Sequence, residues 1–242
     1  MKKTMRADQL LVARGLFESR AKAQAAIEAG NVTANREIVR KVSQLIAEDA
    51  QIEATPAHPY VSRGALKLEA ALDHFKVDPK GKICLDVGAS TGGFTEVLLT
   101  RGASKVYAVD TGTDQLHSRL KRDLRVVSLE QTDIRKLEDA EIPDDARLIV
   151  IDVSFISLEL VIPKALQFAA PHAELIALIK PQFEAGREHV KKGIVRDSEV
   201  HMGVCQRVEL LVGRQGWRLR GTIPSPILGG DGNAEFLLYA EH

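Results

Sequence analysis

The sequence predicts an α/β protein in which a small α+β domain precedes a larger domain built on an open, mostly parallel, seven-stranded sheet. Three observations favour this fold: strand and helix patterns alternate beyond residue 64, glycines cluster after the first of these strands, and basic residues concentrate before residue 42. A chain of 242 residues can bury one substantial core beside a small accessory domain. We expect the small domain at 1–57, a linker at 58–64 and the large domain at 65–242.

Seven segments of the large domain are apolar, rich in β-branched residues and bounded by turn residues, as buried strands are. They lie at 83–87, 105–109, 125–129, 148–152, 175–180, 217–223 and 235–239. The intervening segments favour helices, and a further helix is expected at about 65–75, after Pro59 and Gly64. The glycine-rich run at 229–233 connects the last two strands closely, so the final strand should be antiparallel.

The small domain favours two short helices followed by brief strands at 31–35 and 51–54. Ser19 suits the N-cap of the second helix, and Gly30 suits its end. Residues 1–41 contain nine Lys or Arg and four Asp or Glu, whereas the whole chain has 33 of each class. This excess predicts a polyanionic partner, although a solvated helix face would carry the same charges.

The remaining composition argues against membrane-spanning, secreted, disulfide-rich and metal-binding proteins. The 27% of charged residues and 45% of hydrophobic residues are ordinary for a globular protein, and no apolar run reaches 18 residues. The first residues lack the apolar core of a signal peptide, so we expect a cytoplasmic protein. Two cysteines and seven scattered histidines give neither a disulfide framework nor a metal-ligand pattern.

A nucleotide pocket is predicted where the first strand of the sheet enters a glycine-rich turn. The spacing of Gly88, Gly92 and Gly93 differs from the Gly-x-Gly-x-x-Gly turn that wraps a pyrophosphate. Asp86, which we expect inside the turn, would repel a pyrophosphate and attract a cation. S-adenosylmethionine joins an adenosine to a positively charged amino-acid end, and it is therefore the predicted cofactor.

Two further acidic residues complete the predicted cofactor site. Asp110, at the end of the second strand and 22 residues beyond Gly88, suits both ribose hydroxyls. Asp133 suits either an adenine contact or a helix N-cap, and Asp86 could merely cap the turn. The predicted cofactor-binding residues are Asp86, Gly88, Ser90, Thr91, Gly92, Gly93, Asp110 and Asp133.

Four charged residues fall at or near the rim where the parallel strands end, which is where open sheets bind ligands. Asp152 and Lys180 end two parallel strands. Glu235 opens the antiparallel strand. Lys67 lies one turn into the helix that we expect at about 65–75. A lysine here can accept a proton from a ribose hydroxyl or stabilise the alkoxide during methyl transfer, and we assign Lys180 that role. Each residue alone could be a solvated strand end or a surface lysine, but their joint placement favours a site.

The chain resembles the TlyA family in four segments, at 59–69, 85–95, 150–157 and 179–187. The resemblance covers nearly the whole chain. It implies an FtsJ-like, Rossmann-like methyltransferase domain that acts on the ribose 2′-hydroxyl of ribosomal RNA, typically at cytidine. It also implies a catalytic Lys-Asp-Lys-Glu tetrad at Lys67, Asp152, Lys180 and Glu235. The family's Gly-Tyr-Gly-Gln after the second strand is Gly-Thr-Asp-Gln at 112–115 in this chain.

The N-terminal domain resembles the small RNA-binding domain first known from ribosomal protein S-four. The matching positions are Arg6, Asp8, Leu11, Ser19, Arg20, Ala23, Gly30 and Val32. Where that family has an Asn-Gly pair, this chain has Asn35 and Arg36. The resemblance implies RNA contact, for which we select Arg6, Arg14, Arg20, Lys22, Arg36 and Arg63.

Other functions stay open at this point. Members of the family are often labelled haemolysins, but the most apolar segment, 157–170, is interrupted by Glu159, Pro163 and Lys164. An RNA-binding assembly factor without catalysis, a small-molecule methyltransferase and an NAD enzyme could share the fold. The basic domain favours RNA over a metabolite. We therefore predict a methyltransferase acting on ribosomal RNA or ribosomal subunits, with no membrane or protein partner.

Overall fold

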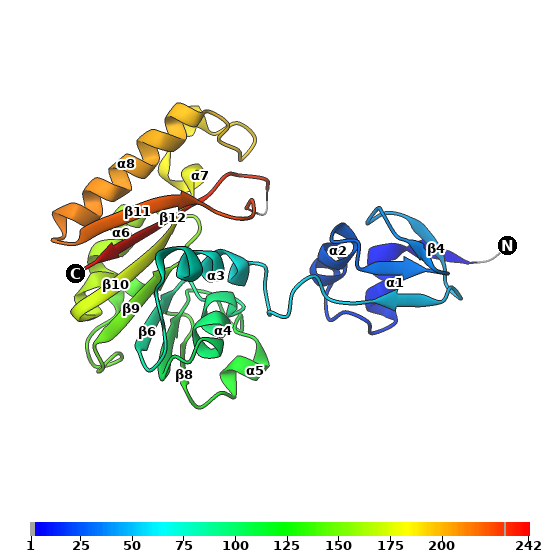
Figure 1. Cartoon of the computed structure of the whole chain (residues 1–242), viewed down its shortest axis with the longest axis horizontal. Helices are drawn as coiled ribbons and strands as arrows, with labels where there is room; N and C mark the ends of the chain where they lie inside the picture. The colour runs from blue at the N-terminus through cyan, green and yellow to red at the C-terminus, as the bar shows by residue number, and fades with distance from the viewer. Residues whose placement is uncertain (1–2, 230) are drawn as a thin grey trace. The chain divides into compact units, whose positions relative to one another are not determined.

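The computed structural model describes residues 3–229 and 231–242. The chain divides into two compact units, Met1–Pro59 and Tyr60–His242, which Figure 1 colours from blue to cyan and from cyan to red. The division falls inside the segment that we expected to be a linker, and residues 60–64 belong to the second unit. Each unit has its own buried apolar core.

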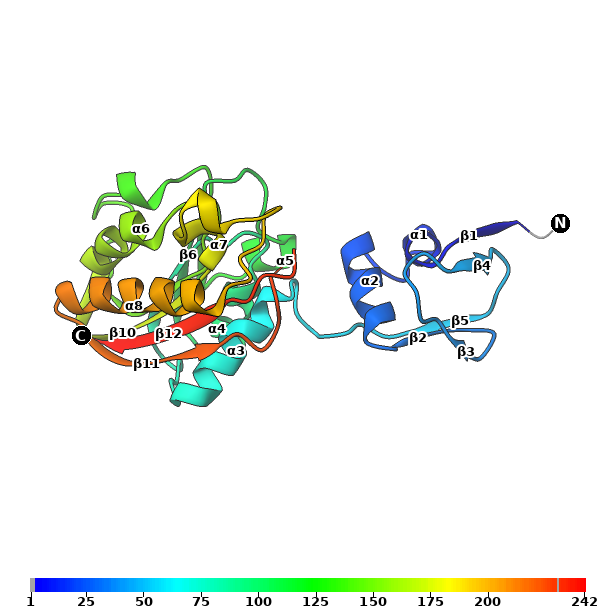
Figure 2. The ribbon, with the colours of Figure 1, turned by 90° about the horizontal axis from the view of Figure 1, so that it is seen from above.

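The first unit contains two helices and two small antiparallel sheets (Figures 1 and 2). Ser19 caps the second helix by accepting the N–H of Lys22 (3.3 Å), as predicted, and Gly30 follows that helix with a φ of 75°. In the sheets, β2 pairs with β3 and β5, and β1 pairs with β4. The elements are β1 (Thr4–Arg6), α1 (Ala7–Ala13), α2 (Arg20–Glu28), β2 (Val32–Ala34), β3 (Glu37–Ile38), β4 (Leu45–Ala47) and β5 (Ile52–Ala54).

Asn35 and Arg36 form the turn between β2 and β3, and Ala34 lies opposite Glu37 in the ladder. Both turn residues have positive φ, 51° and 71°. Two positive φ angles in a two-residue hairpin loop define a type I′ turn, whose twist matches the flanking strands. The chain therefore forms the turn that an Asn-Gly pair favours, although Arg36 stands in place of the glycine. The backbone of Arg36 adopts a left-handed conformation that glycine favours.

Seven strands of the second unit form one sheet in the order β11-β12-β10-β9-β6-β7-β8. They are β6 (Ile83–Val87), β7 (Lys105–Val109), β8 (Val126–Leu129), β9 (Ala146–Ile151), β10 (Ala169–Ile179), β11 (Arg218–Pro224) and β12 (Phe236–Glu241). β12 is antiparallel to both neighbours, whereas the pairs among β6 to β10 are parallel. The predicted fold class, a mostly parallel sheet with an antiparallel last strand, is confirmed.

Helices cover both faces of the sheet (Figure 2). On one face lie α3 (Gly64–Phe75), α4 (Gly93–Thr100) and α5 (Ser118–Lys121), and on the other lie α6 (Leu158–Ala165), α8 (Ser198–Arg214) and the short η1 (Ile134–Lys136). The remaining short helices are η2 (Leu166–Phe168), α7 (Pro181–Glu184) and η3 (Arg187–His189). Successive strand residues point to opposite faces, so Ile149 and Ile151 join one core cluster whereas Leu148 and Val150 join the other. A sheet buried on both faces explains why its central strands are continuous apolar runs.

Arg36→Gly should stabilise the first unit by about 0.5–1 kcal/mol, because glycine adopts positive φ without the steric cost of a Cβ. Hydrogen–deuterium exchange on the full chain measures the effect as slower exchange of the amides of β2 and β3. Arg40→Gly is the matched control, because Arg40 has no positive φ and glycine there adds freedom mainly to the unfolded chain. Unchanged or faster exchange in Arg36→Gly would contradict the turn assignment.

Candidate active site

Two adjoining cavities lie at the edge of the sheet where the parallel strands end. The first, called the wide cavity, has a volume of about 360 Å³, and its lining includes Asp110, Thr111, Asp133 and Phe155. The second, called the lysine cavity, has a volume of about 250 Å³, and its lining includes Lys67, Thr91, Gly93 and Lys180. Both cavities share Gly88, Ser90, Asp152 and Ser154 as lining residues. One ligand can therefore extend from the first cavity into the second.

The glycine turn between β6 and α4 forms the wall that the cavities share. Gly88 has a φ of 86°, and a Cβ there would overlap the main-chain carbonyl oxygen of Asp152. A Cβ on Gly93 would lie 3.0 Å from the main-chain nitrogen of Ala65 and would overlap the Ser62 hydroxyl. Glycine is thus required at both positions, because other segments of the chain approach them closely. The end of β9 contacts the turn at Gly88, and the start of α3 contacts it at Gly93.

Asp110 follows β7 directly and is held by the glycine turn. One carboxylate oxygen accepts the N–H of Ser90 (2.8 Å), and the other accepts the N–H of Gly112 (2.7 Å). The side chain lines the wide cavity. Each oxygen of an ionised carboxylate can accept more than one hydrogen bond, so both can still take a ribose hydroxyl. The predicted ribose contact at Asp110 fits this geometry.

Asp133 lines the wide cavity and also caps η1, so both roles weighed for it have a structural counterpart. Its carboxylate accepts the N–H of Arg135 (3.0 Å) and pairs with the Arg135 guanidinium (2.6 Å). This hydrogen bond from Arg135 is the main cause that holds the pKa of Asp133 below its usual value. The carboxylate is therefore ionised at neutral pH, and the adenine contact stays a prediction.

Asp86 does not lie in the turn, contrary to the sequence-based expectation. It is the fourth residue of β6, is fully buried, and lines neither cavity. One carboxylate oxygen accepts the Thr95 hydroxyl (2.6 Å), and the other has no hydrogen-bond partner. Burial raises the pKa of Asp86 to about 7. The carboxylate thus lies beneath the glycine turn and is tied to α4, and it does not meet a cationic ligand directly.

Asp152 and Lys180 form an ion pair at the shared rim. The Lys180 ammonium lies 2.6 Å from one Asp152 oxygen and donates to the Ser154 hydroxyl (2.9 Å). Asp152 follows β9 and Lys180 follows β10, and these neighbouring parallel strands place the two side chains together. The lysine side chain is only 10% exposed, so its ammonium is held by protein groups.

Lys67 and Glu235 form the second ion pair of the site. The ammonium of Lys67, on α3, donates to the Glu235 carboxylate at 2.5 Å, and both residues are buried. Glu235 precedes the antiparallel β12, whose start lies at the same edge as the ends of β9 and β10. Lys67 lines the lysine cavity, whereas Glu235 binds the Lys67 ammonium and does not itself line that cavity. The four charged residues therefore enter the site as two pairs, and their catalytic roles stay a prediction.

Ser154 and Phe155 were not selected from the sequence, although both lie at the rim. Phe155 is 90% exposed, has a φ of 64°, and packs its ring 4.9 Å from that of Phe183. A bulky residue rarely adopts positive φ, and Phe155 lines the wide cavity together with Asp152 and Ser154. Their sequence signals are their position two and three residues after the strand-ending Asp152 and within the segment 150–157 that resembles the TlyA family.

The basic residues selected for RNA contact differ in how they are held. Arg6 donates to both oxygens of the fully buried Asp8, at 3.0 and 3.4 Å. Arg20 donates to one of these oxygens at 2.6 Å, and Gln24 donates to that same oxygen. Burial raises the pKa of Asp8, but the hydrogen bonds from Arg6, Arg20 and Gln24 outweigh it and hold the pKa well below its usual range. Both arginine side chains stay partly exposed, at 40% and 54%.

The other selected basic residues differ in their contacts and in their position in the chain. Arg14 donates to the main-chain carbonyls of Ala50 and Glu48, so it also braces the fold. Lys22 pairs with Glu18 at 2.5 Å. Arg36 occupies the exposed β2–β3 turn, whereas Arg63 precedes α3 and belongs to the second unit. The selected residues therefore do not all belong to one domain.

A seven-stranded sheet with an antiparallel strand between β10 and β11, and with a cavity beyond the glycine turn, is the fold of Rossmann-like methyltransferases. The S-adenosylmethionine-dependent methyltransferase from Listeria monocytogenes shares this fold with a TM-score of 0.55 and 17% identity, over 74% of this chain and 97% of that one. The chain belongs to the FtsJ-like methyltransferase family, which matches residues 60–242. An S4 domain matches residues 5–52.

Relatives of higher identity span nearly the whole chain. The 16S/23S rRNA (cytidine-2'-O)-methyltransferase TlyA of Mycobacterium tuberculosis is 40% identical over 99% of this chain and 90% of its own length. A solved structure from Streptococcus thermophilus, named as a hemolysin, is 42% identical with a TM-score of 0.78, and the match covers 100% of this chain and 89% of that one. The predicted TlyA resemblance is confirmed.

Asp86→Asn should remove a pH dependence from the stability of the second unit. Because the pKa is raised, the folded chain keeps a proton that the unfolded chain loses between about pH 4 and pH 7, so rising pH lowers wild-type stability across that window. Relative to Asp86→Asn, the wild-type free energy of unfolding should fall by roughly 2 kcal/mol from pH 5 to pH 8. Urea unfolding followed by fluorescence of Trp217, the one tryptophan, measures it.

The matched control is Asp123→Asn. The hydrogen bond from Arg125 lowers the pKa of Asp123, so its contribution to stability is lost only in more acidic solution and should be constant from pH 5 to pH 8. Wild-type and Asp86→Asn curves that run parallel over this range would show that Asp86 does not take up a proton in the folded chain.

Proposed function

We propose that the protein transfers a methyl group from S-adenosylmethionine to a ribose 2′-hydroxyl of ribosomal RNA, at cytidine. The observation that carries this proposal is the Asp152–Lys180 ion pair on the wall of a cavity that adjoins the wide cavity. The printed activity of the Mycobacterium tuberculosis relative supports the substrate class. The S4 domain supports binding of a structured RNA.

The residues of the wide cavity fit the donor molecule. The two oxygens of Asp110 can accept the ribose hydroxyls, and Asp133 with the apolar Ile134 and Val161 lies further along the same cavity. The glycine turn contributes the main chain of Ser90 and Thr91 beside the lysine cavity. When bound, the cofactor supplies an activated methyl group on a sulfonium. The residues that would receive the acceptor ribose lie in the adjoining lysine cavity.

In the proposed reaction, Lys180 in its neutral amine form would take the proton of the 2′-hydroxyl while that oxygen accepts the methyl group that the cofactor's sulfonium supplies, and Lys180 would become the ammonium that pairs with Asp152. Asp152 and Ser154 fix the direction of the Lys180 amine. The Lys67–Glu235 pair keeps a second cation at the cavity wall, where it can stabilise negative charge on the oxygen. The low exposure of Lys67, Lys180 and Glu235 limits water and holds the groups in place, which favours an in-line geometry.

The membrane-lytic function is the weaker hypothesis. The hemolysin name of the Streptococcus thermophilus protein refers to that protein. In the part of this chain that the structure describes, no helix has the length and apolar character needed to cross a bilayer. We place methyl transfer first because two ion pairs, one buried and one at the cavity wall, meet two adjoining cavities at one edge of the sheet.

The proposal is tested by incubating ribosomal subunits with the protein and radiolabelled S-adenosylmethionine and then mapping the modified ribose. Lys180→Ala should reduce turnover by roughly 10²- to 10⁴-fold and leave cofactor binding nearly unchanged, since Lys180 acts on the acceptor oxygen. Lys80→Ala, at an exposed lysine that lines neither cavity, should retain wild-type activity. Label on a base, or full activity of Lys180→Ala, would refute the proposed chemistry.

Phe155→Ala should raise the KM for RNA by roughly 5- to 100-fold, because an exposed aromatic ring at the rim can stack on a base of the substrate. Phe155→Trp should retain binding. Leu160→Ala changes another exposed apolar residue, on α6, and serves as the control. Thermal unfolding should be little altered in all three variants, because both positions are exposed. An unchanged KM in Phe155→Ala would exclude the stacking contact.

A further inference from the structure

The segment that follows β7, residues 110–116, is called the ribose loop because Asp110 and Thr111 line the wide cavity. Its path is tightly folded: a Cβ on Gly112 would lie 3.0 Å from an Asp110 oxygen and 2.5 Å from the side chain of Gln115. Asp114 has a φ of 53°, which costs free energy for a residue with a Cβ. Such a loop keeps one conformation only if other contacts hold it.

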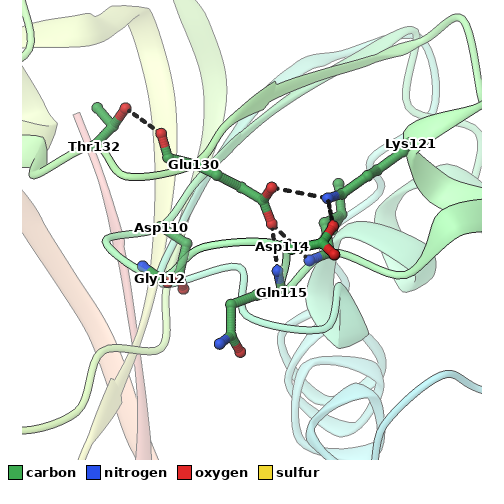
Figure 3. Close-up of polar contacts among 8 residues, drawn as sticks. Asp110, Gly112, Asp114, Gln115, Lys121, Glu130 and Thr132 are labelled. Carbon is green, nitrogen blue, oxygen red and sulfur yellow. Dashed lines mark hydrogen bonds and ion pairs between the residues drawn. The ribbon is translucent and has the colours of Figure 1, made fainter.

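Glu130, directly after β8, supplies contacts of this kind (Figure 3). One of its oxygens accepts the N–H groups of Gln115 (2.6 Å) and Leu116 (2.8 Å). The other pairs with Lys121 (2.8 Å), whose ammonium also binds Asp114 (2.7 Å). The bond from Lys121 is the main cause that holds the pKa of Glu130 below its usual value, so the carboxylate is charged at neutral pH.

The residues that Glu130 holds connect the ribose loop to the glycine turn. Leu116 packs so closely on the turn that a Cβ on Gly92 would lie 2.8 Å from its side chain. His117 donates its N–H to the carbonyl of Thr91 (3.2 Å). At the other end of the loop, Gln131 donates to the carbonyl of Gly112 (2.9 Å), and Gly112 in turn donates to Asp110. Glu130 itself lines neither cavity.

We propose that Glu130 is a positioning residue for the methyl donor, which holds the ribose loop so that Asp110 meets the ribose hydroxyls. The inference rests on the proposed function only for the place of the ribose at Asp110. Loss of the Glu130 carboxylate leaves the N–H groups of Gln115 and Leu116 without their acceptor, and the ribose loop then shifts, which displaces the Gly112 N–H from Asp110. Asp110 loses a donor that orients it, while the Asp152–Lys180 pair on neighbouring strands is untouched.

The test measures binding of S-adenosylhomocysteine to the full chain by calorimetry, together with methyl-transfer kinetics. Glu130→Ala should raise the Kd about tenfold or more, and Glu130→Gln, which keeps an oxygen for the two N–H groups, should raise it less. The KM for S-adenosylmethionine should rise while kcat at saturation stays within about twofold, as expected for lost binding that is equal in ground and transition states.

The matched control is Glu141→Ala. The Glu141 carboxylate also accepts a main-chain N–H, that of Glu138 (2.8 Å), but neither residue lines a cavity. A second probe, the 2′-deoxyribose analogue of S-adenosylhomocysteine, isolates the ribose contact. Wild type should prefer the ribose form, and Glu130→Ala should lose part of that preference. A merely structural role would not change this ratio.

Several results would overturn the inference. An unchanged Kd in Glu130→Ala, or an equal loss for the ribose and deoxyribose probes, would exclude the positioning role. If Glu130→Ala does not fold, Lys121→Met and Glu130→Gln decide, and wild-type binding in both would refute it. A wild-type chain that binds no S-adenosylhomocysteine would refute this inference and the proposed function together. Binding with the predicted Glu130 effects, but without methylation of ribosomal RNA, would refute the proposed function alone.

Discussion

The close approach of Gly88 to the main-chain carbonyl of Asp152 is the constraint on which the rest of the site depends. It allows β6 and β9, which are neighbours in the sheet, to keep contact beyond their ends, where Asp152 also donates its N–H to the carbonyl of Val87 (2.9 Å). The turn that lines both cavities and the aspartate that pairs with Lys180 are thereby parts of one junction. A side chain at position 88 would separate the two halves of the proposed chemistry.

Buried charge is the second general feature of the methyltransferase unit. Removing an ion from water is costly, and removing one partner of a buried pair leaves the other uncompensated. Lys67 and Glu235 compensate each other, and so do Lys180 and Asp152, so the edge of the sheet contains four charges with little net charge. Asp86 is the exception, because only Thr95 supports it, and its proton is held more tightly as a result.

The sheet and much of the site could be predicted because their signals are local. Apolar runs bounded by turns marked the strands, and charged residues directly after them marked Asp152 and Lys180. Other features depend on tertiary contacts. β10 starts at Ala169, earlier than expected. Pro171 and His172 do not favour a strand, and the pairing of β10 with β9 is irregular between Ala169 and Glu174. No pattern in the sequence indicates that Asp86 is fully buried or that Phe155 is exposed. The main-chain contacts of Glu130 also have no sequence pattern, since backbone N–H groups are present at nearly every residue.

The buried Asp8 has a consequence for how the first unit meets a polyanion. Arginine side chains are flexible in water, and immobilising one on a phosphate ordinarily sacrifices rotamer freedom. Arg6 and Arg20 have already lost much of that freedom, because each guanidinium rests on the same carboxylate while its outer edge stays accessible. Their planar groups are thus held in place in advance, which lowers the entropy cost of the proposed contact with an RNA backbone.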